Sequence, residues 1–146
     1  MNILDTIVEN KRVVILKRKR KRPLSNLKTF ASYGRKTNPI DLRGLQDRPG
    51  IIAEFKRRSP SKGSINEAAD PVTVAGGYRD AGAVAVSILT DRRFFGGSFL
   101  DMLEVRLAYP GLTLLRKDFI IDPYQIHESG AYGADMVLLI AAILDR

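Results

Sequence analysis

The stretch Ile51-Ile52-Ala53-Glu54-Phe55-Lys56-Arg57-Arg58-Ser59-Pro60-Ser61-Lys62-Gly63 begins with the pattern of a β-strand and ends with that of a polar loop. Because side chains alternate along a strand, Phe55 is expected on one face, and Glu54 and Lys56 on the other. Burying either charge unpaired costs on the order of several kcal/mol, so the two should face a polar cavity at the strand's end. The loop's hydroxyls, cations and glycine suit an anion. The stretch leaves one alternative open, an edge strand with a solvated, charged end.

The composition predicts one domain of ordinary size, because the chain has 146 residues and a hydrophobic content of 45%. Cysteine is absent, which excludes disulfides and thiolate metal sites and agrees with a reducing compartment. No apolar run approaches the ~20 residues of a membrane helix. A mixed, charged stretch follows Met1, unlike a signal peptide. We therefore expect a soluble, cytoplasmic protein with no membrane partner.

The net charge is +8 and the pI is near 10.0, and much of the excess lies in the basic run Lys17-Arg18-Lys19-Arg20-Lys21-Arg22. Such a run can bind nucleic acid through electrostatics. It can equally form the solvated end of a helix, which favours cations. No aromatic or glycine-rich residues of the usual RNA-binding kind are interleaved with it, so the sequence disfavours a nucleic-acid partner.

Strand and helix patterns alternate from Ile51 onward, after a helix predicted over residues 2–22, a proline stop at Pro23, and a turn-rich segment with a short helix over 27–32. The predicted strands begin near Ile51, Val84, Leu112 and Met136, with the second spanning 84–89, the third 112–115 and the fourth 136–140. The predicted helices between them start at Asp70-Pro71, Ser98 and Asp122-Pro123.

This order predicts an α/β fold with a parallel sheet and right-handed crossovers. A doubly wound sheet fits the same order, but no glycine-rich dinucleotide loop follows the first strand. Charged residues recur instead where strands end, at Glu54, Lys56, Asp91 and Lys117. That layout is typical of the catalytic face of a (β/α)8 barrel.

Four stretches, in the same order along the chain, resemble indole-3-glycerol phosphate synthase. They are residues 51–63, Ser87-Ile88-Leu89-Thr90-Asp91 leading to Phe94-Phe95-Gly96-Gly97-Ser98, residues 115–125 beginning Leu115-Arg116-Lys117-Asp118-Phe119, and residues 133–140, Gly133-Ala134-Asp135-Met136-Val137-Leu138-Leu139-Ile140. The resemblance implies a TIM barrel of which only the first four βα units are present. Residues 1–50 would then be an N-terminal helical extension, and residues 51–146 the first half of the barrel.

The resemblance also implies a reaction, the ring closure of 1-(2-carboxyphenylamino)-1-deoxyribulose 5-phosphate with loss of carbon dioxide and water. No redox cofactor and no metal are implied. Lys117 matches the family's general acid, although without the resemblance the sequence favours an exposed lysine at a loop start. Lys56 matches a lysine that contacts the substrate's anionic groups and assists later proton transfer. Glu54 matches the carboxylate that orients both lysines.

The resemblance assigns substrate contacts to five further residues. Ser59 and Ser61 lie in the loop expected to meet substrate oxygens, and Phe95, Phe119 and Leu138 match apolar residues that hold the aromatic ring. Ordinary core packing is the alternative role for the three apolar residues. His127, the only histidine, is expected on a helix surface.

The family's second carboxylate and its phosphate-binding loops would lie beyond Arg146, so we expect this chain to be inactive alone on its small phosphorylated substrate. A half-barrel has two open sheet edges, which predicts a homo-oligomer or association with a missing C-terminal half. Two other functions remain open. One is a non-catalytic half-barrel interaction protein with a basic, nucleic-acid-binding N-terminal segment. The other is a barrel like phosphoribosylanthranilate isomerase, against which the motifs around Lys56 and Lys117 argue.

Overall fold

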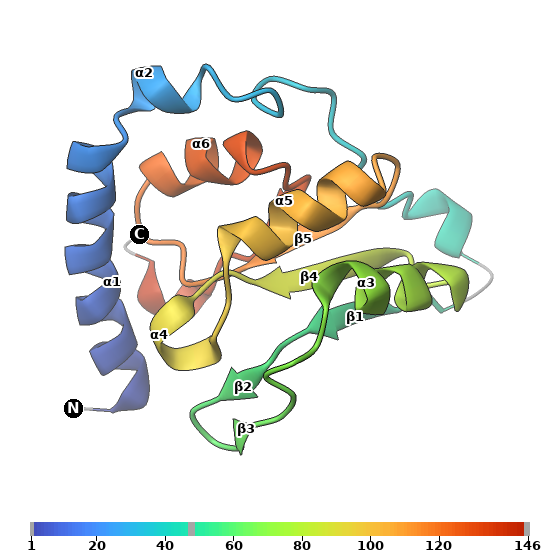
Figure 1. Ribbon diagram of the computed structural model, residues 1–146, viewed down its shortest axis with the longest axis horizontal. Coiled ribbons are helices and arrows are strands. Elements are labelled where there is room, and N and C mark those ends of the chain that lie inside the picture. Colours follow the sequence, from blue (N-terminus) through green and yellow to red (C-terminus); the bar gives the residue numbers. More distant parts are fainter. Residues whose placement is uncertain (1, 47–48, 145–146) are drawn as a thin grey trace.

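One parallel sheet of four strands organises the protein (Figure 1), whose computed structural model describes residues 2–46 and 49–144. The strand order is β1 (Ile52–Phe55), β4 (Ala85–Leu89), β5 (Leu114–Lys117) and β6 (Met136–Val137). Each strand pairs in parallel with the next one along the chain that belongs to this sheet. This arrangement confirms the predicted βα order and corresponds to part of a TIM barrel.

Helices connect the strands, and most begin where the sequence predicts. They are α3 (Pro71–Asp80), α4 (Arg92–Phe95), α5 (Phe99–Ala108) and α6 (Tyr124–Ala131). The Asp70 carboxylate accepts the backbone N–H of Thr73 at 2.7 Å, and Pro71 occupies the first helical position. Ser98 caps α5 by accepting the N–H of Leu100 at 3.0 Å.

The hydrophobic core fills the space between the sheet and α3 and α5. Its buried members are Phe55, Val86, Ile88 and Leu114 from the strands, with Ala75, Met102, Val105, Leu112 and Ala134. Phe55 thus faces the helices, which places Glu54 on the opposite face, as the alternation predicts. Ionisable side chains at the ends of β1 and β5 are left on the side away from this core.

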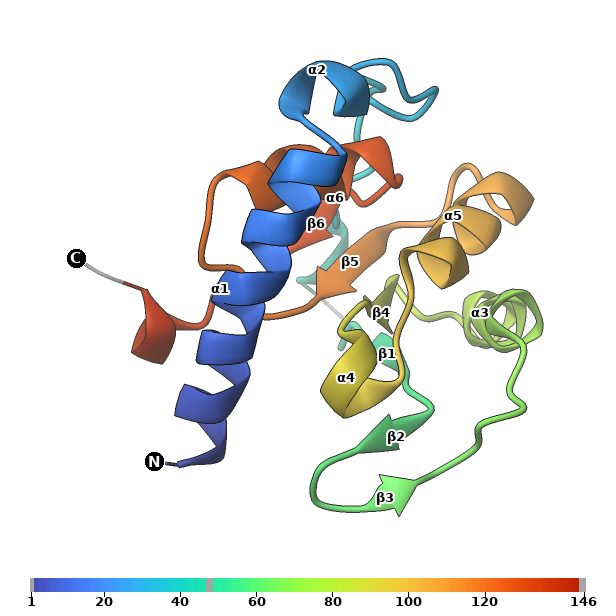
Figure 2. The same cartoon turned by 60° about the vertical axis from the view of Figure 1, so that its left-hand side comes forward.

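The N-terminal segment consists of α1 (Ile3–Lys21), α2 (Leu24–Leu27) and η1 (Arg43–Leu45). Asn2 and Asp5 form a capping box at the start of α1. Figure 1 shows α1 on the side toward which the arrows of β1 and β4 point, and Figure 2 shows it alongside α6. A second buried cluster joins these elements: Ile15, Leu27, Tyr124 and Ala131. No helix within the described residues is long and apolar enough to cross a membrane.

Several boundaries differ from the predictions for local reasons. The short helix lies at Leu24–Leu27 rather than over 27–32, because the Pro23 carbonyl starts it by accepting the N–H of Leu27. β5 begins at Leu114 rather than Leu112, whose N–H bonds the Tyr109 carbonyl in a turn.

The fourth strand is also shorter than predicted. β6 ends at Val137 rather than Ile140, and the chain then forms η2 (Ala141–Ile143). Two further elements were not predicted: α4, and a hairpin of β2 (Arg58–Ser59) and β3 (Gly63–Ser64) after β1. These elements are too short to produce a periodic pattern.

Candidate active site

The Glu54 carboxylate joins two lysines at the ends of β1 and β5, the strands that flank β4 on its two sides. Its Oε2 lies 2.6 Å from Lys117 Nζ, and its Oε1 lies 2.9 Å from Lys56 Nζ. The strand register brings these groups together, because Ser87 on β4 pairs with Glu54 on one side and with Leu115 on the other. Lys117 follows Leu115 by two residues and therefore projects from the same face. The three charges therefore lie together, as the resemblance implies, and their roles stay a prediction.

Glu54 remains ionised in this setting. Its side chain is 26% exposed, and this burial alone would raise its pKa. Hydrogen bonds from Lys117 and Lys56, with their positive charges, outweigh that effect and hold the pKa below its usual value. Each carboxylate oxygen thus binds one ammonium group, which fixes both lysine side chains in place.

A cavity of about 80 Å³ opens beside this triad. Its lining consists of Glu54, Lys56, Leu89, Phe95, Lys117, Asp118, Phe119, Leu138 and Ile140. The rings of Phe95 and Phe119 lie 6.0 Å apart between centroids, at an interplanar angle of 36°. Every predicted catalytic residue and every predicted apolar contact therefore meets in one cavity.

Ser59 and Ser61 do not line this cavity. Both belong to the β2–β3 hairpin region, which projects from the sheet in Figure 2. Ser59 Oγ accepts the N–H of Lys62 at 3.2 Å and lies 3.4 Å from Ser61 Oγ, so the two hydroxyls currently organise their own turn. Their contact with a substrate stays a prediction.

A protein-family model described as indole-3-glycerol phosphate synthase matches residues 4–146, nearly the whole chain. The chain belongs to the indole-3-glycerol phosphate synthase family. The motifs that suggested this family in the sequence are the ones that form the cavity.

Individual relatives support the same assignment. Indole-3-glycerol phosphate synthase of Parafrankia sp. (strain EAN1pec) is 46% identical over 148 residues, covering 100% of this chain and 54% of that protein. The enzyme of Saccharopolyspora erythraea is 43% identical over 148 residues, with the same coverage. That of Mycobacterium avium (strain 104) is 44% identical over 146 residues, covering 99% of this chain and 53% of that protein. The chain thus spans about half the length of the curated relatives it matches.

A second set of charges, centred on Lys11 of α1, was not predicted from the sequence. Lys11 is only 2% exposed, and its Nζ lies 2.7 Å from Asp91 Oδ2 and 2.7 Å from Asp118 Oδ1. A signal was available, since Lys11 falls four residues after Ile7 and four before Ile15, the two buried residues of the same helix face. A lysine on an apolar stripe needs buried carboxylate partners.

Arg116 is the second cation of this set and is completely buried. It donates to Asp118 Oδ2 at 2.9 Å and to Glu128 Oε2 at 3.2 Å, and lies over the Phe99 ring at 4.6 Å. Burial raises the pKa of Asp118, but Arg116 and Lys11 oppose it and hold this pKa well below its usual range. The sequence hint was a charge at Arg116 on the strand face that points toward the helices.

The basic run is partly engaged in contacts within the chain. Arg18 pairs with Glu128 at 3.3 Å, Lys19 pairs with Asp122 at 2.7 Å, and Arg22 contacts the Tyr132 hydroxyl. The run therefore helps to dock α1 on α6. The expectation of a surface position for His127 is wrong in part, because His127 is half-buried with Nδ1 2.8 Å from the Tyr33 hydroxyl.

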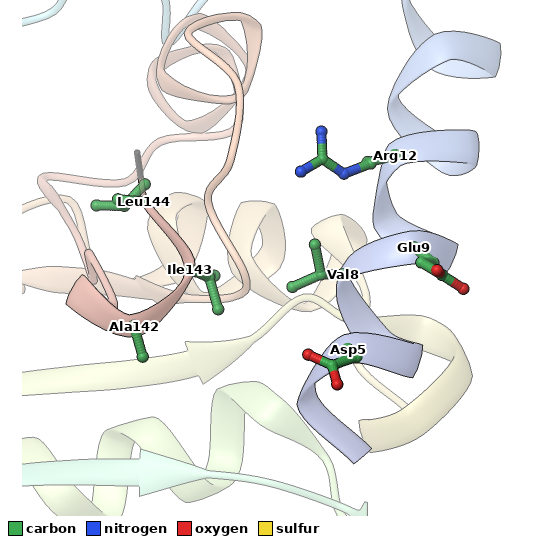
Figure 3. A pocket seen from close by; sticks show the side chains of 7 residues that line it. All are labelled: Asp5, Val8, Glu9, Arg12, Ala142, Ile143 and Leu144. Carbon is green, nitrogen blue, oxygen red and sulfur yellow. The ribbon is translucent and has the colours of Figure 1, made fainter. Parts of the chain in front are cut away.

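A larger cavity of about 630 Å³ lies elsewhere, between α1 and η2. Its lining is Asp5, Val8, Glu9, Arg12, Ala142, Ile143 and Leu144, and contains none of the predicted site residues. Figure 3 shows Val8 and Arg12 extending from α1 toward the side that carries Ile143, whereas Glu9 points away. Within residues 2–46 and 49–144, no group of three or more metal-ligating side chains comes together in this cavity or elsewhere.

Proposed function

We propose that this chain supplies the acid half of an indole-3-glycerol phosphate synthase site. The substrate would be 1-(2-carboxyphenylamino)-1-deoxyribulose 5-phosphate, closed to the indole ring with loss of carbon dioxide and water in tryptophan biosynthesis. The observation that carries this proposal is the Glu54 carboxylate, which holds Lys117 and Lys56 at 2.6 and 2.9 Å beside an aromatic-lined cavity. Like its relatives, the completed enzyme would be a carbon–carbon lyase, and we propose that it works in the cytoplasm.

Lys117 would act as the general acid. As the ring carbon that carries the carboxylate attacks the ketone carbon, Lys117 Nζ gives a proton to the ketone oxygen. Carbon dioxide then leaves, and its bonding electrons restore the aromatic ring. The new hydroxyl takes up a proton and departs as water, while the adjacent carbon that bears the nitrogen gives up a proton and the second double bond of the indole forms. Glu54 keeps Lys117 aimed, and Lys56 binds an anionic group and assists the later proton transfer.

The remaining predicted residues would bind the substrate. Phe95, Phe119 and Leu138 would enclose its aromatic ring, and the hairpin hydroxyls of Ser59 and Ser61 would reach its oxygens. A cavity of about 80 Å³ is small beside the roughly 300–1,000 Å³ of typical ligand pockets. The substrate's phosphate-bearing end therefore needs surfaces outside the described residues, and we propose that a C-terminal half of the barrel, or a second copy of this chain, supplies them. In that division, residues 1–50 are the extension and 51–146 the half-barrel.

The alternative of a nucleic-acid-binding scaffold receives less support. Three residues of the basic run, Arg18, Lys19 and Arg22, already have partners within the chain. A scaffold also has no use for a carboxylate that fixes two lysines beside an aromatic cavity.

The proposal is tested by Lys117→Ala in this chain combined with a C-terminal half from a relative. We expect turnover to fall by at least ~10²-fold with the Michaelis constant changed less than about tenfold, because proton donation acts mainly in the transition state. Lys28→Ala, which removes an exposed lysine of the extension, is the control and should leave both constants unchanged. Near-normal turnover of Lys117→Ala would remove Lys117 from the acid role.

A further inference from the structure

Lys11 makes an unusual connection between the N-terminal helix and the sheet. Its ammonium group lies within hydrogen-bonding distance of two carboxylates, Asp91 after β4 and Asp118 after β5, and all three side chains are nearly inaccessible to solvent. A buried ammonium is tolerated only with such partners. Arg116 is the second cation on Asp118 and also pairs with Glu128, which Arg18 meets in turn, so three cations face three carboxylates.

Asp91 links Lys11 to the helix that carries Phe95. Its Oδ2 binds Lys11, while its Oδ1 accepts the backbone N–H of Phe94 at 2.8 Å and so caps α4. α4 has four residues and ends at Phe95, too short to be stable without its cap and surroundings. The position of the Phe95 ring therefore depends on the orientation of the Asp91 carboxylate.

Asp118 links Lys11 to the backbone of Phe119. The same oxygen, Oδ1, binds Lys11 Nζ and accepts the backbone N–H of Phe119 at 2.8 Å. The other oxygen, Oδ2, is held by Arg116 at 2.9 Å and by the Thr90 hydroxyl at 2.7 Å. Lys11 thus completes the set of contacts that fix the backbone directly after Lys117.

We propose that Lys11 is a positioning residue that places Phe95 and Phe119 as the two-ring wall of the cavity. A single side chain of α1 fixes both carboxylates, and each carboxylate fixes the backbone at one ring. The helix that lies outside the sheet thereby shapes the site. That this wall receives a substrate ring rests on the proposed function; the placement of the rings by Lys11 does not.

The test is Lys11→Met in the 146-residue chain, with two NMR measurements that need no substrate. Amide hydrogen exchange at Phe94 and Phe119 should become about tenfold faster than in the wild type, because each amide loses a firmly held acceptor. The ring-to-ring NOE between Phe95 and Phe119 should weaken. Amides of the central strands, such as that of Ile88, should keep their rank as the slowest to exchange.

Arg106→Met is the matched control, since it breaks a buried ion pair with Asp135 that holds the N–H of Leu114 at the opposite end of β5. It should destabilise the fold without altering the Phe94 and Phe119 amides selectively. If Lys11→Met does not fold, the double variant Lys11→Met with Asp91→Asn replaces it. Asp118 then keeps Arg116 as its cation, and the asparagine side chain at position 91 can still cap α4. In that variant only Phe119 should exchange faster.

Unchanged exchange at Phe119 in a folded variant that lacks Lys11 would overturn the proposal. The proposal would also be overturned if Arg106→Met accelerated exchange at Phe94 and Phe119 as much as Lys11→Met does. Because neither readout involves turnover, a failure of the proposed synthase function would leave this result intact, and the reverse also holds.

Discussion

At the scale of single residues, Glu54 shows what strand periodicity can predict about a site. Alternation along β1 predicts that Glu54 and Lys56 share a face, and the charges that recur where strands end predict Lys117, on the far side of β4, at the same edge of the sheet. Lys11 and Arg116 escaped prediction because their partners lie far along the chain or on other elements: Lys11 and Asp118 are 107 positions apart by their numbers. Only the docking of α1 brings such groups together.

The lowered pKa of Glu54 predicts a pH-dependent contribution to stability. A carboxyl whose pKa is lower in the folded chain than its usual 4.5 stabilises the fold above about pH 4.5, and loses that effect as the pH falls through the folded value. The difference in the free energy of unfolding between the wild type and Glu54→Gln should therefore shrink between about pH 7 and about pH 3. Denaturant unfolding at a series of pH values measures it.

Glu104→Gln serves as the control for this series, because Glu104 is exposed on α5 and makes no ion pair among the described residues. Its difference from the wild type should stay near zero at every pH. A Glu54→Gln difference that is constant, or that grows on acidification, would contradict the charge coupling between Glu54 and the two lysines.

At the scale of elements, the best predictions concern the helices with strong caps and the worst concern short or irregular segments. α3 and α5 begin where Asp70 and Ser98 predict, because a cap acts locally. The end of β6 could not be predicted, since residues 138–140 carry a strand-like apolar pattern, although the strand ends at Val137 and two of these residues, Leu138 and Ile140, line the cavity. Tertiary position, not propensity, decides such ends.

The docking of α1 predicts a contrast between its apolar and basic residues. Ile15→Ala should lower the free energy of unfolding by about 2–5 kcal/mol, because Ile15 is 2% exposed in the cluster shared with α6. Lys19→Ala should cost less than about 1 kcal/mol, since its ion pair with Asp122 is largely solvated. Chemical denaturation monitored by circular dichroism measures both. Equal losses, or a larger loss for Lys19→Ala, would show that the basic run dominates the docking.

At the scale of the whole molecule, the described sheet has open edges at β1 and β6. Apolar side chains are exposed at β1 and just beyond β6: Ile52 is 46% accessible, and Leu139, two residues after β6 ends, is 57% accessible. Edges of this kind normally find a partner. We expect the chain to form a homodimer or larger assembly.

Sedimentation velocity at micromolar concentration tests this expectation. The wild type should sediment as a dimer or larger, and Leu139→Lys should shift it toward monomer, because a charge directly beside a sheet edge opposes pairing. Glu104→Lys places the same charge on an exposed helix and should leave the association unchanged. A compact, cooperatively folding wild-type monomer would rule out the assembly.

The central claim is that this chain carries the acid half of a synthase site that a second half completes. It is tested most directly by measuring indole-3-glycerol phosphate formation by the chain alone and after mixing with a separately produced C-terminal half of the Parafrankia relative. We predict no measurable product from the chain alone, because proximity and electrostatic stabilisation require groups beyond Glu54, Lys56 and Lys117. We predict product from the mixture. Robust product formation by the chain alone, or none from a mixture that sediments as a complex, would contradict the account.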